Sequence, residues 1–270
     1  MSANPKSIPE TELLVPFESQ ALPTHCKEYY TAKRQNFFAS IQGFREIWDC
    51  YMLFDKILLL EFEDLKAANT PSQLFPLLLY FNAHAKIRVS FELALSGCMA
   101  EARSILRDAI EFVAHAHHIL RDPALQITWL NKNDELKAFK DAFERDKKEK
   151  LFKGLDELHK VWGQLSETGS HATINAICDR FKMSEDDKSV SWRLNYCGIE
   201  QDFWEKSLFH MLLTFSTVER TLFCDYESRL QFDESLLQLR HEFDARKEKL
   251  RKTIIARYKI PPPNVAKTKP

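Results

Sequence analysis

Residues 100–121, AEARSILRDAIEFVAHAHHILR, carry the most regular pattern in this chain of 270 residues. Their apolar side chains recur in steps of three and four, at Ala102, Ile105, Ala109, Phe112, Ala116 and Ile119. Because an α-helix turns once in about 3.6 residues, this spacing places them along one face of a helix. The segment is therefore predicted to be an amphipathic helix that packs on a core.

Composition extends this prediction to the whole chain. Only six glycines are present, residues 124–260 contain no proline, and hydrophobic residues make up 44% of the chain, which favours helices around a substantial core. The predicted fold class is all-α, a single large antiparallel bundle of about six to eight helices. We expect an irregular N-terminal arm over residues 1–23, the bundle over residues 24–260, and a proline- and lysine-rich tail over residues 261–270.

Capping residues, glycine and proline indicate where the helices begin and end. Residues 24–68 are predicted to form one long helix or two helices broken at Gly43. Thr70-Pro71-Ser72-Gln73 has the pattern of a capping box, so a helix should start there and end near Gly97. Asp122-Pro123 should end the helix of residues 100–121. The elements expected after it are a charged helix over residues 134–165 with a solvated face at residues 144–150, a short helix over residues 171–181, a loop or small hairpin over residues 184–198, an apolar helix over residues 204–226 and a closing helix over residues 234–258.

Charge and cysteine content exclude several classes of protein. The formal net charge of -1 gives no global attraction to nucleic acid or to an anionic membrane. The six cysteines include no close pair of the kind that binds zinc or exchanges disulfides. No signal peptide and no apolar stretch long enough to span a bilayer is recognisable, so we expect a cytoplasmic protein without a membrane partner.

A polar row lies opposite the apolar stripe of residues 100–121. Arg103, Arg107, Glu111, His115 and His118 follow one another in steps of four, four, four and three. A row of guanidinium, carboxylate and imidazole groups is what a phosphate-handling or acid–base site requires. Charged residues opposite an apolar stripe are also typical of a helix face in water, and this structural interpretation is the favoured one.

Metal, nucleotide and nucleophile motifs are absent, so no cofactor is expected. Glu111, His115 and His118 offer a possible metal-binding row, but the sequence lacks the Glu-x-x-His pairs of carboxylate-bridged metal bundles. It also lacks phosphate-binding Gly-rich loops and the Gly-x-Ser-x-Gly elbow. A metal- or ligand-binding bundle is therefore the hypothesis ranked last.

Residues 101–111 (EARSILRDAIE) and residues 165–171 (LSETGSH) resemble motifs of a bacterial all-helical family catalogued only as a domain of unknown function. The matched region spans residues 93–177, about a third of the chain. The resemblance implies a helical bundle and, through genome context, a place in bacterial stress or phage-defence systems. It implies no particular activity.

The same residues are more distantly similar to the HEPN helical nucleases, whose signature is an arginine separated from a histidine by four to six residues. This chain departs from that signature, because Ser166 stands five residues before His171 and Arg107 precedes His115 by one residue too many. The similarity therefore implies that an arginine comes from another helix, with Arg107 the best donor.

Two functions follow as alternatives. The first is a non-catalytic binding, scaffold or regulatory module that contacts a protein partner or a second copy through the seam of residues 204–226 and a basic C-terminal helix. Residues 240–270 hold ten basic and three acidic side chains, so RNA is a second possible partner of that helix. The second is a metal-independent ribonuclease or phosphate-directed enzyme. Here His171 is the acid or base, Arg107 stabilises negative charge, Glu111 orients them, and Arg103, His115, His118 and Ser166 are candidate binding residues.

Overall fold

The structure, a computed structural model, describes residues 23–68, 70–167, 181–186, 189–194, 201–228 and 231–259. Its described residues confirm the all-α prediction, with one small hairpin as an addition. The α-helices are α2 (Thr24–Gly43), α3 (Arg45–Asp64), α4 (Pro71–Leu95), α5 (Met99–Arg121), α6 (Leu125–Leu130), α7 (Leu136–Phe139), α8 (Asp156–Leu165), α10 (Gln201–Glu227) and α11 (Glu234–Tyr258). None of these helices is long and apolar enough to cross a membrane.

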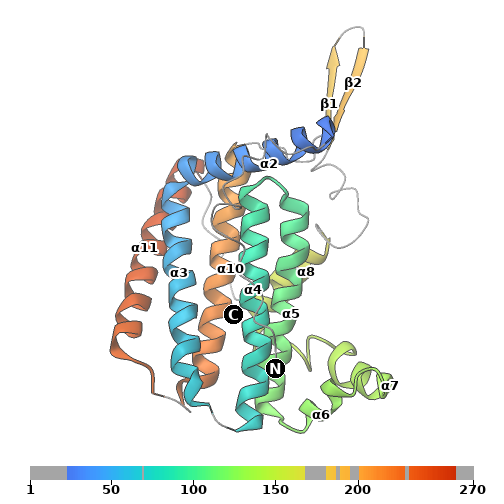
Figure 1. Ribbon diagram of the computed structural model, residues 1–270, viewed down its shortest axis with the longest axis vertical. Helices are drawn as coiled ribbons and strands as arrows, with labels where there is room; N and C mark the ends of the chain where they lie inside the picture. Colours follow the sequence, from blue (N-terminus) through green and yellow to red (C-terminus); the bar gives the residue numbers. More distant parts are fainter. Residues whose placement is uncertain are drawn as a thin grey trace, which may run out of the picture.

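Five long helices, α3, α4, α5, α10 and α11, lie side by side, and α2 crosses one end of them (Figure 1). The antiparallel pair α4 and α5 is joined by a tight turn at Gly97, whose φ of 89° favours glycine. Close to this turn, the Ser90 hydroxyl donates to the carbonyl of Ala102 over 2.7 Å. Buried alanines on both helices, Ala83, Ala94, Ala102, Ala109, Ala114 and Ala116, let the backbones approach closely.

Aromatic side chains from four helices meet at the centre of the bundle. The ring of Tyr51 on α3 stacks on that of Phe91 on α4 with centroids 4.0 Å apart, and Phe54 stacks on Phe215 of α10 at 5.5 Å. Phe243 of α11 completes the group at 6.1 Å from Phe54. Offset and tilted ring pairs of this kind add to the hydrophobic stabilisation of a core.

The seam of residues 204–226 belongs to this core. Trp204, Leu208, Phe215 and Tyr226 are all at most 2% exposed. The helix prediction is confirmed, but the expectation that this seam binds a partner is wrong, because the bundle itself covers it.

Two predicted helix boundaries are confirmed, although one is capped differently from the prediction. The first long helix breaks at Gly43, since Phe44 leaves helical geometry and α3 starts at Arg45. The next helix begins at Pro71 after Thr70, as the capping box predicted. The Thr70 side chain makes no capping bond to the backbone, however, and its hydroxyl instead donates to Gln73 Oε1 over 2.9 Å.

The predicted charged helix over residues 134–165 is confirmed in its last part, as α8 (Asp156–Leu165), and is wrong for residues 140–155. The chain forms the four-residue α7, a π-helical turn (Lys140–Glu144) and a series of turns before α8 begins at Asp156. Positive φ values at Asp146 and Gly154 interrupt the helix, and Leu151 and Phe152 between them are buried. Burial of these two side chains outweighs the helix propensity of the charged residues around them.

A hairpin forms where the sequence indicated a loop or small hairpin. Strand β1 (Phe181–Asp186) pairs antiparallel with β2 (Ser189–Leu194), with Phe181 opposite Leu194 and Asp186 opposite Ser189. The helix predicted over residues 171–181 falls largely outside the described residues, as do most of the predicted arm and the predicted tail.

Candidate functional site

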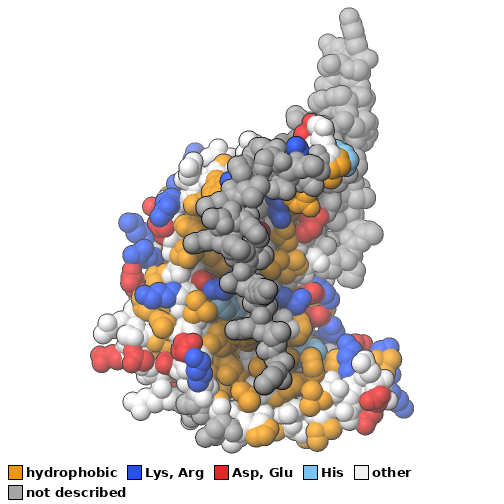
Figure 2. Space-filling view, viewed as in Figure 1, with side chains coloured by type: hydrophobic (Ala, Val, Ile, Leu, Met, Phe, Trp, Pro, Cys, Tyr) orange, Lys and Arg blue, Asp and Glu red, His pale blue; other side chains and the backbone are white. Residues whose placement is uncertain are grey.

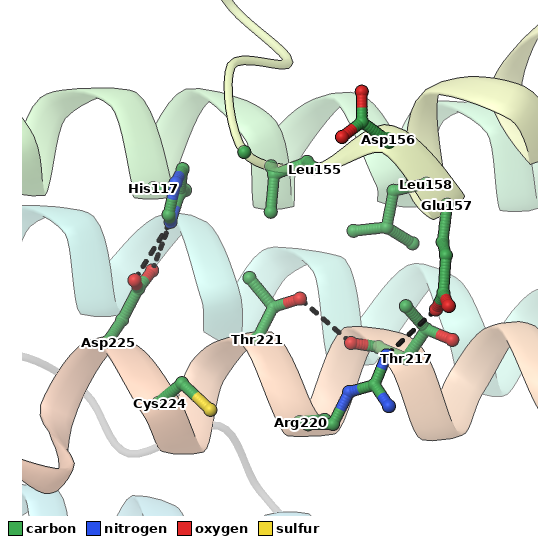
Figure 3. Close-up of a pocket in the computed structure, with 11 residues that line it drawn as sticks. His117, Leu155, Asp156, Glu157, Leu158, Thr217, Arg220, Thr221, Cys224 and Asp225 are labelled. Carbon is green, nitrogen blue, oxygen red and sulfur yellow. Dashed lines mark hydrogen bonds and ion pairs between the residues drawn. The ribbon is translucent and has the colours of Figure 1, made fainter.

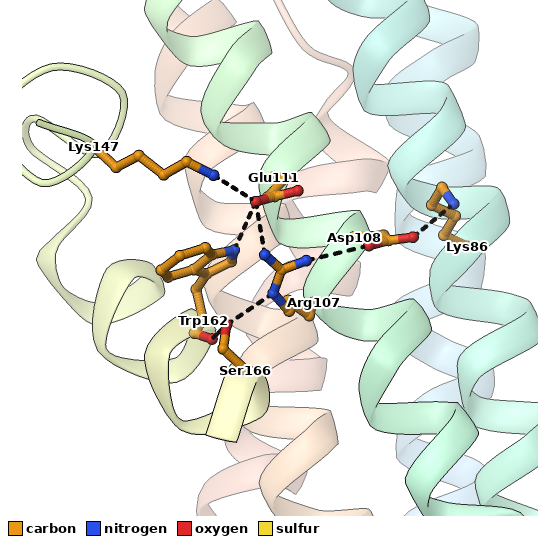
Figure 4. Close-up of polar contacts among 7 residues, drawn as sticks. All are labelled: Lys86, Arg107, Asp108, Glu111, Lys147, Trp162 and Ser166. Atoms are coloured by element: carbon orange, nitrogen blue, oxygen red, sulfur yellow. Dashed lines mark hydrogen bonds and ion pairs between the residues drawn. The ribbon is translucent and has the colours of Figure 1, made fainter. Parts of the chain in front are cut away.

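The polar row on α5 does not face open water at its centre, because α8 and the turns before it lie against it (Figure 4). The side chain of Arg107 is 19% exposed and that of Glu111 is 25% exposed. The expectation of a fully solvated polar face is therefore wrong for these two residues. They form a cluster with Lys147, Trp162 and Ser166, which we call the Arg107 cluster.

Glu111 is the acceptor at the centre of the Arg107 cluster. Its Oε1 accepts hydrogen bonds from Lys147 Nζ over 3.0 Å, from Trp162 Nε1 over 3.1 Å and from Arg107 Nη2 over 3.2 Å. Burial by itself raises the pKa of this carboxyl, but Lys147, Arg107 and Trp162 together lower it below its ordinary value. Glu111 is consequently a carboxylate at neutral pH.

Arg107 connects this carboxylate to α8. Its Nε donates to Ser166 Oγ over 2.8 Å, and Ser166 Oγ donates in turn to the carbonyl of Trp162 over 2.8 Å. The guanidinium of Arg107 and the ammonium of Lys147 each lie 4.9 Å from the centroid of the Trp162 ring. The two cations lie around the indole of Trp162 and the carboxylate of Glu111. Their charge-assisted and cation–π contacts hold α5 against α8 and the turns before it.

The arrangement has one chemical capacity beyond holding α8 in place. An anionic group that displaced Glu111 from Arg107 and Lys147 would find two cationic donors in a partly dry setting, together with the Ser166 hydroxyl. In the structure these donors are engaged with Glu111 and Ser166. The geometry is therefore that of a closed clamp, which an incoming anion would have to open.

His115 and His118 are placed by aromatic contacts. Trp129 Nε1 donates to His115 Nδ1 over 2.8 Å, and the His115 ring stacks on Phe143 with centroids 4.9 Å apart. Burial lowers the pKa of His115 to about 4, so its imidazole is neutral at pH 7. His118 meets Phe143 edge-on at 5.7 Å, and burial lowers its pKa as well.

The remaining predicted site residues are Arg103 and His171. Arg103 lies with its guanidinium 5.3 Å from the ring centroid of Phe203 on α10. His171, the predicted acid or base, lies outside the described residues. Within the part of the chain that is described, no group of three or more His, Cys, Asp or Glu side chains is placed to hold a metal ion.

The sequence did not identify Lys147 and Trp162 as members of the cluster. Lys147 belongs to residues 144–150, which were expected to be a solvated face, but its side chain is only 26% exposed. Trp162 stands one helical turn before Ser166, which is a signal for a shared helix face. Nothing in the spacing connects either residue to Glu111, which lies 36 and 51 positions away.

The basic residues of α11 are largely paired within the protein. Arg240 lies on Glu61 and Glu219, Arg246 on Glu242, Lys247 on Asp244, Arg251 on Glu248 and Arg257 on Glu205. These pairs reduce the field that the last helix presents to a polyanion. Binding of RNA by this helix remains a prediction from the sequence.

A different surface, on α3 and α4, exposes large apolar side chains (Figure 2). Each of six side chains is at least 42% exposed: Met52, Leu59, Leu74, Leu78, Phe81 and Val89. The two helices touch along this face, since the rings of Phe62 and Phe81 lie 5.4 Å apart and Arg88 forms a two-pronged ion pair with Asp55. We call this surface the α3–α4 face.

No protein-family model, no curated protein and no solved structure matches the chain.

Proposed function

We propose that this protein is a helical binding module and that the α3–α4 face is its docking surface for an amphipathic helix of a partner protein. The observation that carries the proposal is the exposed ridge of α4. Leu74, Leu78, Phe81, Ala85 and Val89 follow one another in steps of four, three, four and four and are all exposed.

The shape of the ridge favours a helical partner. From Leu74 to Val89 the helix makes fifteen steps and rises about 22 Å, the length of roughly four turns. A partner helix with apolar residues at positions i, i+3, i+4 and i+7 can lay them along such a ridge. Exposed apolar surface of this extent is uncommon on a protein that has no partner.

The neighbouring helix α3 adds exposed apolar side chains and a positive charge to the α3–α4 face. Met52 and Leu59 on α3 flank the exposed Lys56 at spacings of four and three. A carboxylate on the partner helix opposite Lys56 would therefore fix its register. The bacterial stress or phage-defence context implied by the family resemblance is a setting in which such a regulatory module would act.

Photo-crosslinking tests the proposal. The full chain carries p-benzoylphenylalanine at position 78 or, as a control, at the exposed position 237 on α11, and both variants are irradiated in the protein's own cells. We expect position 78 alone to give one adduct with another protein, attached through a segment of helical apolar periodicity. The substitution Phe81→Glu should abolish that adduct without lowering the thermal unfolding midpoint, because Phe81 is 56% exposed.

Three outcomes of this experiment contradict the proposal. An adduct between two copies of the chain means that the face is a homodimer interface. A crosslink from position 78 to residues 1–22 of the same molecule means that the chain covers its own ridge. No adduct at all means that the ridge has no partner.

A second function, a metal-independent phosphate-directed enzyme such as a ribonuclease, is favoured by one contact. The 2.8 Å hydrogen bond from Arg107 to Ser166 joins two segments that are 59 residues apart in the sequence. These segments are the two motifs that resemble the helical family. His171 follows Ser166 by five residues, and we propose it as the acid or base, with Arg107 stabilising developing negative charge and Glu111 orienting Arg107.

RNA cleavage in the presence of a metal chelator tests this alternative. Wild type should cut a single-stranded RNA, and His171→Ala should lower the rate by about 100-fold or more. His25→Ala is the matched control, since His25 is exposed on α2 and should not matter. Absence of cleavage by the wild type, or equal rates in all three proteins, removes the enzymatic function and leaves the docking proposal untouched.

A further inference from the structure

An open groove with a volume of about 320 Å³ lies between α5, the start of α8 and α10 (Figure 3). Its size is that of a pocket for a small organic molecule. His117 and Asp225 stand at one end, and the ion pair of Arg220 with Glu157 closes the other. The groove shares no residue with the Arg107 cluster or with the α3–α4 face.

Three helices hold His117 in one orientation. Asp225 on α10 lies 2.8 Å from His117 Nδ1 on α5, and it accepts a second hydrogen bond from the Tyr80 hydroxyl on α4 over 2.5 Å. Tyr80 is fully buried, and burial raises its pKa well above the ordinary value, so it remains a donor. A carboxylate can only accept, so His117 donates its Nδ1 proton to Asp225, and Nε2 is the acceptor atom of the neutral imidazole.

A ligand can approach Nε2 of His117 because residue 154 carries no side chain. Residue 154 is glycine with a φ of 84°, and a Cβ there would stand 3.9 Å from Nε2 and 3.2 Å from Arg121 Nη1. Arg121 is held by the carbonyl of Lys153 over 3.0 Å, and its Nη1 is 3.4 Å from Nε2, a long contact. A hydroxyl arriving here can donate to Nε2 and accept from Arg121.

The other end of the groove is rich in acceptors. The hydroxyls of Thr217 and Thr221 already donate to the carbonyls of Leu213 and Thr217, so only their lone pairs remain available. Together with the carboxylate of Glu157 they make three acceptors against the single cation Arg220. A primary ammonium has three N–H donors and matches this set, whereas a carboxylate would meet oxygen lone pairs.

We propose that this groove binds a small aliphatic amino alcohol, with its ammonium between Glu157, Thr217 and Thr221 and its hydroxyl on His117 Nε2. The carbon chain between these groups lies on the apolar side chains of Leu155 and Leu158. From Thr217 to Asp225 the helix α10 rises about 12 Å, which leaves room for a chain of a few carbon atoms. Arg220 yields its place on Glu157 at small cost, because their ion pair is mostly exposed.

Three matched probes test the proposal on the full chain labelled with ¹⁵N in histidine. 4-Amino-1-butanol carries both groups, 1-aminobutane lacks the hydroxyl and 1-butanol lacks the ammonium. We expect 4-amino-1-butanol to bind about tenfold more tightly than either of the others, since each lost group removes a charge-assisted or buried hydrogen bond. It alone should shift the Nε2 resonance of His117.

Substitutions test whether the ammonium of the ligand binds at Glu157. Glu157→Gln should weaken binding of 4-amino-1-butanol by about tenfold, because it replaces a charged acceptor with a neutral one. Glu157 is exposed, so the fold should survive the change. Glu248→Gln, which breaks a comparable exposed ion pair with Arg251 on α11, is the control and should leave binding unchanged. Equal binding of all three probes, no binding at tens of millimolar, or full binding by Glu157→Gln overturns the proposal.

Discussion

Glu111 and Glu61 are both partly or fully removed from water, yet their pKa values move in opposite directions. Glu111 meets three donors on one oxygen, and its pKa falls. Glu61 is 0% exposed and shares Arg240 with Glu219, while its Oε2 has no hydrogen-bond partner. Burial therefore dominates and raises the pKa of Glu61 to about 8.

Substitution of Glu111 tests the Arg107 cluster as a clamp. Glu111→Gln should lower the free energy of unfolding at pH 7 by about 1–3 kcal/mol, because Arg107 and Lys147 lose their shared carboxylate. The folded-state pKa lies below the unfolded value near 4.5, so this contribution is present above that pH and disappears as pH falls through the folded pKa. Urea unfolding of both proteins at several pH values measures the difference. Glu144→Gln, at an exposed position, is the control, and a difference independent of pH would contradict the assignment.

The raised pKa of Glu61 predicts that its contribution to stability depends on pH in the opposite direction. Its folded pKa of about 8 lies above the ordinary value of 4.5, so the folded state keeps a proton that the unfolded state has released. The contribution of Glu61 to stability should therefore be greatest below about pH 4.5 and decline as pH rises toward about 8. In Glu61→Gln this decline should be absent, so the variant should become the more stable protein at alkaline pH. Guanidinium unfolding at pH 5 to 9 measures it, with the exposed Glu63→Gln as the control.

Part of the candidate site could be predicted from the sequence. The step of four between Arg107 and Glu111 predicted that they share a helix face, and the structure adds Ser166 through a contact over 59 residues. Periodicity reports neighbours on one helix and is silent about what covers them. For this reason the row on α5 was predicted to be exposed, although His115 is only partly exposed and its ring stacks on Phe143.

At the scale of elements, long periodic helices could be predicted and the segment between α5 and α8 could not. The closing helix runs from Glu234 to Tyr258, as its composition predicted. Between residues 125 and 155, helix propensity competes with the burial of Leu151 and Phe152 in a core built from distant segments. That competition is decided by tertiary contacts, which local patterns do not contain.

Substitutions in α11 test how a helix of mostly polar residues is held to the rest of the bundle. Its mean hydropathy is low, so a few buried side chains, Leu236, Phe243, Leu250 and Ile254, anchor it. Phe243→Ala should lower the free energy of unfolding by about 3–5 kcal/mol, because it empties the space beside Phe54. Leu237→Ala, at a partly exposed position of the same helix, should cost less than about 1 kcal/mol. Chemical denaturation measures both, and equal losses would mean that α11 is not held by its apolar anchors.

At the scale of the molecule, the buried side chains form one connected core. It reaches from Ile47 on α3 through Phe91, Ile110 and Phe215 to Ile254 on α11. The side chains of Leu151 and Phe152, from the irregular segment, belong to the same cluster. A core without internal boundaries leaves no group of helices that can lose its packing alone.

The connected core predicts a single cooperative unfolding transition. Helix content, followed by far-ultraviolet circular dichroism, should be lost at the same urea concentration as the fluorescence of Trp48 and Trp204, which belong to opposite halves of the chain. Substituting Trp129, Trp162 and Trp192 by Phe confines the signal to these two residues. Ile110→Ala, in the centre of the core, should move both transitions together to lower urea, because its cavity weakens contacts shared by all the long helices. If the two probes separate, or if the substitution moves only one of them, the bundle consists of two units that unfold independently.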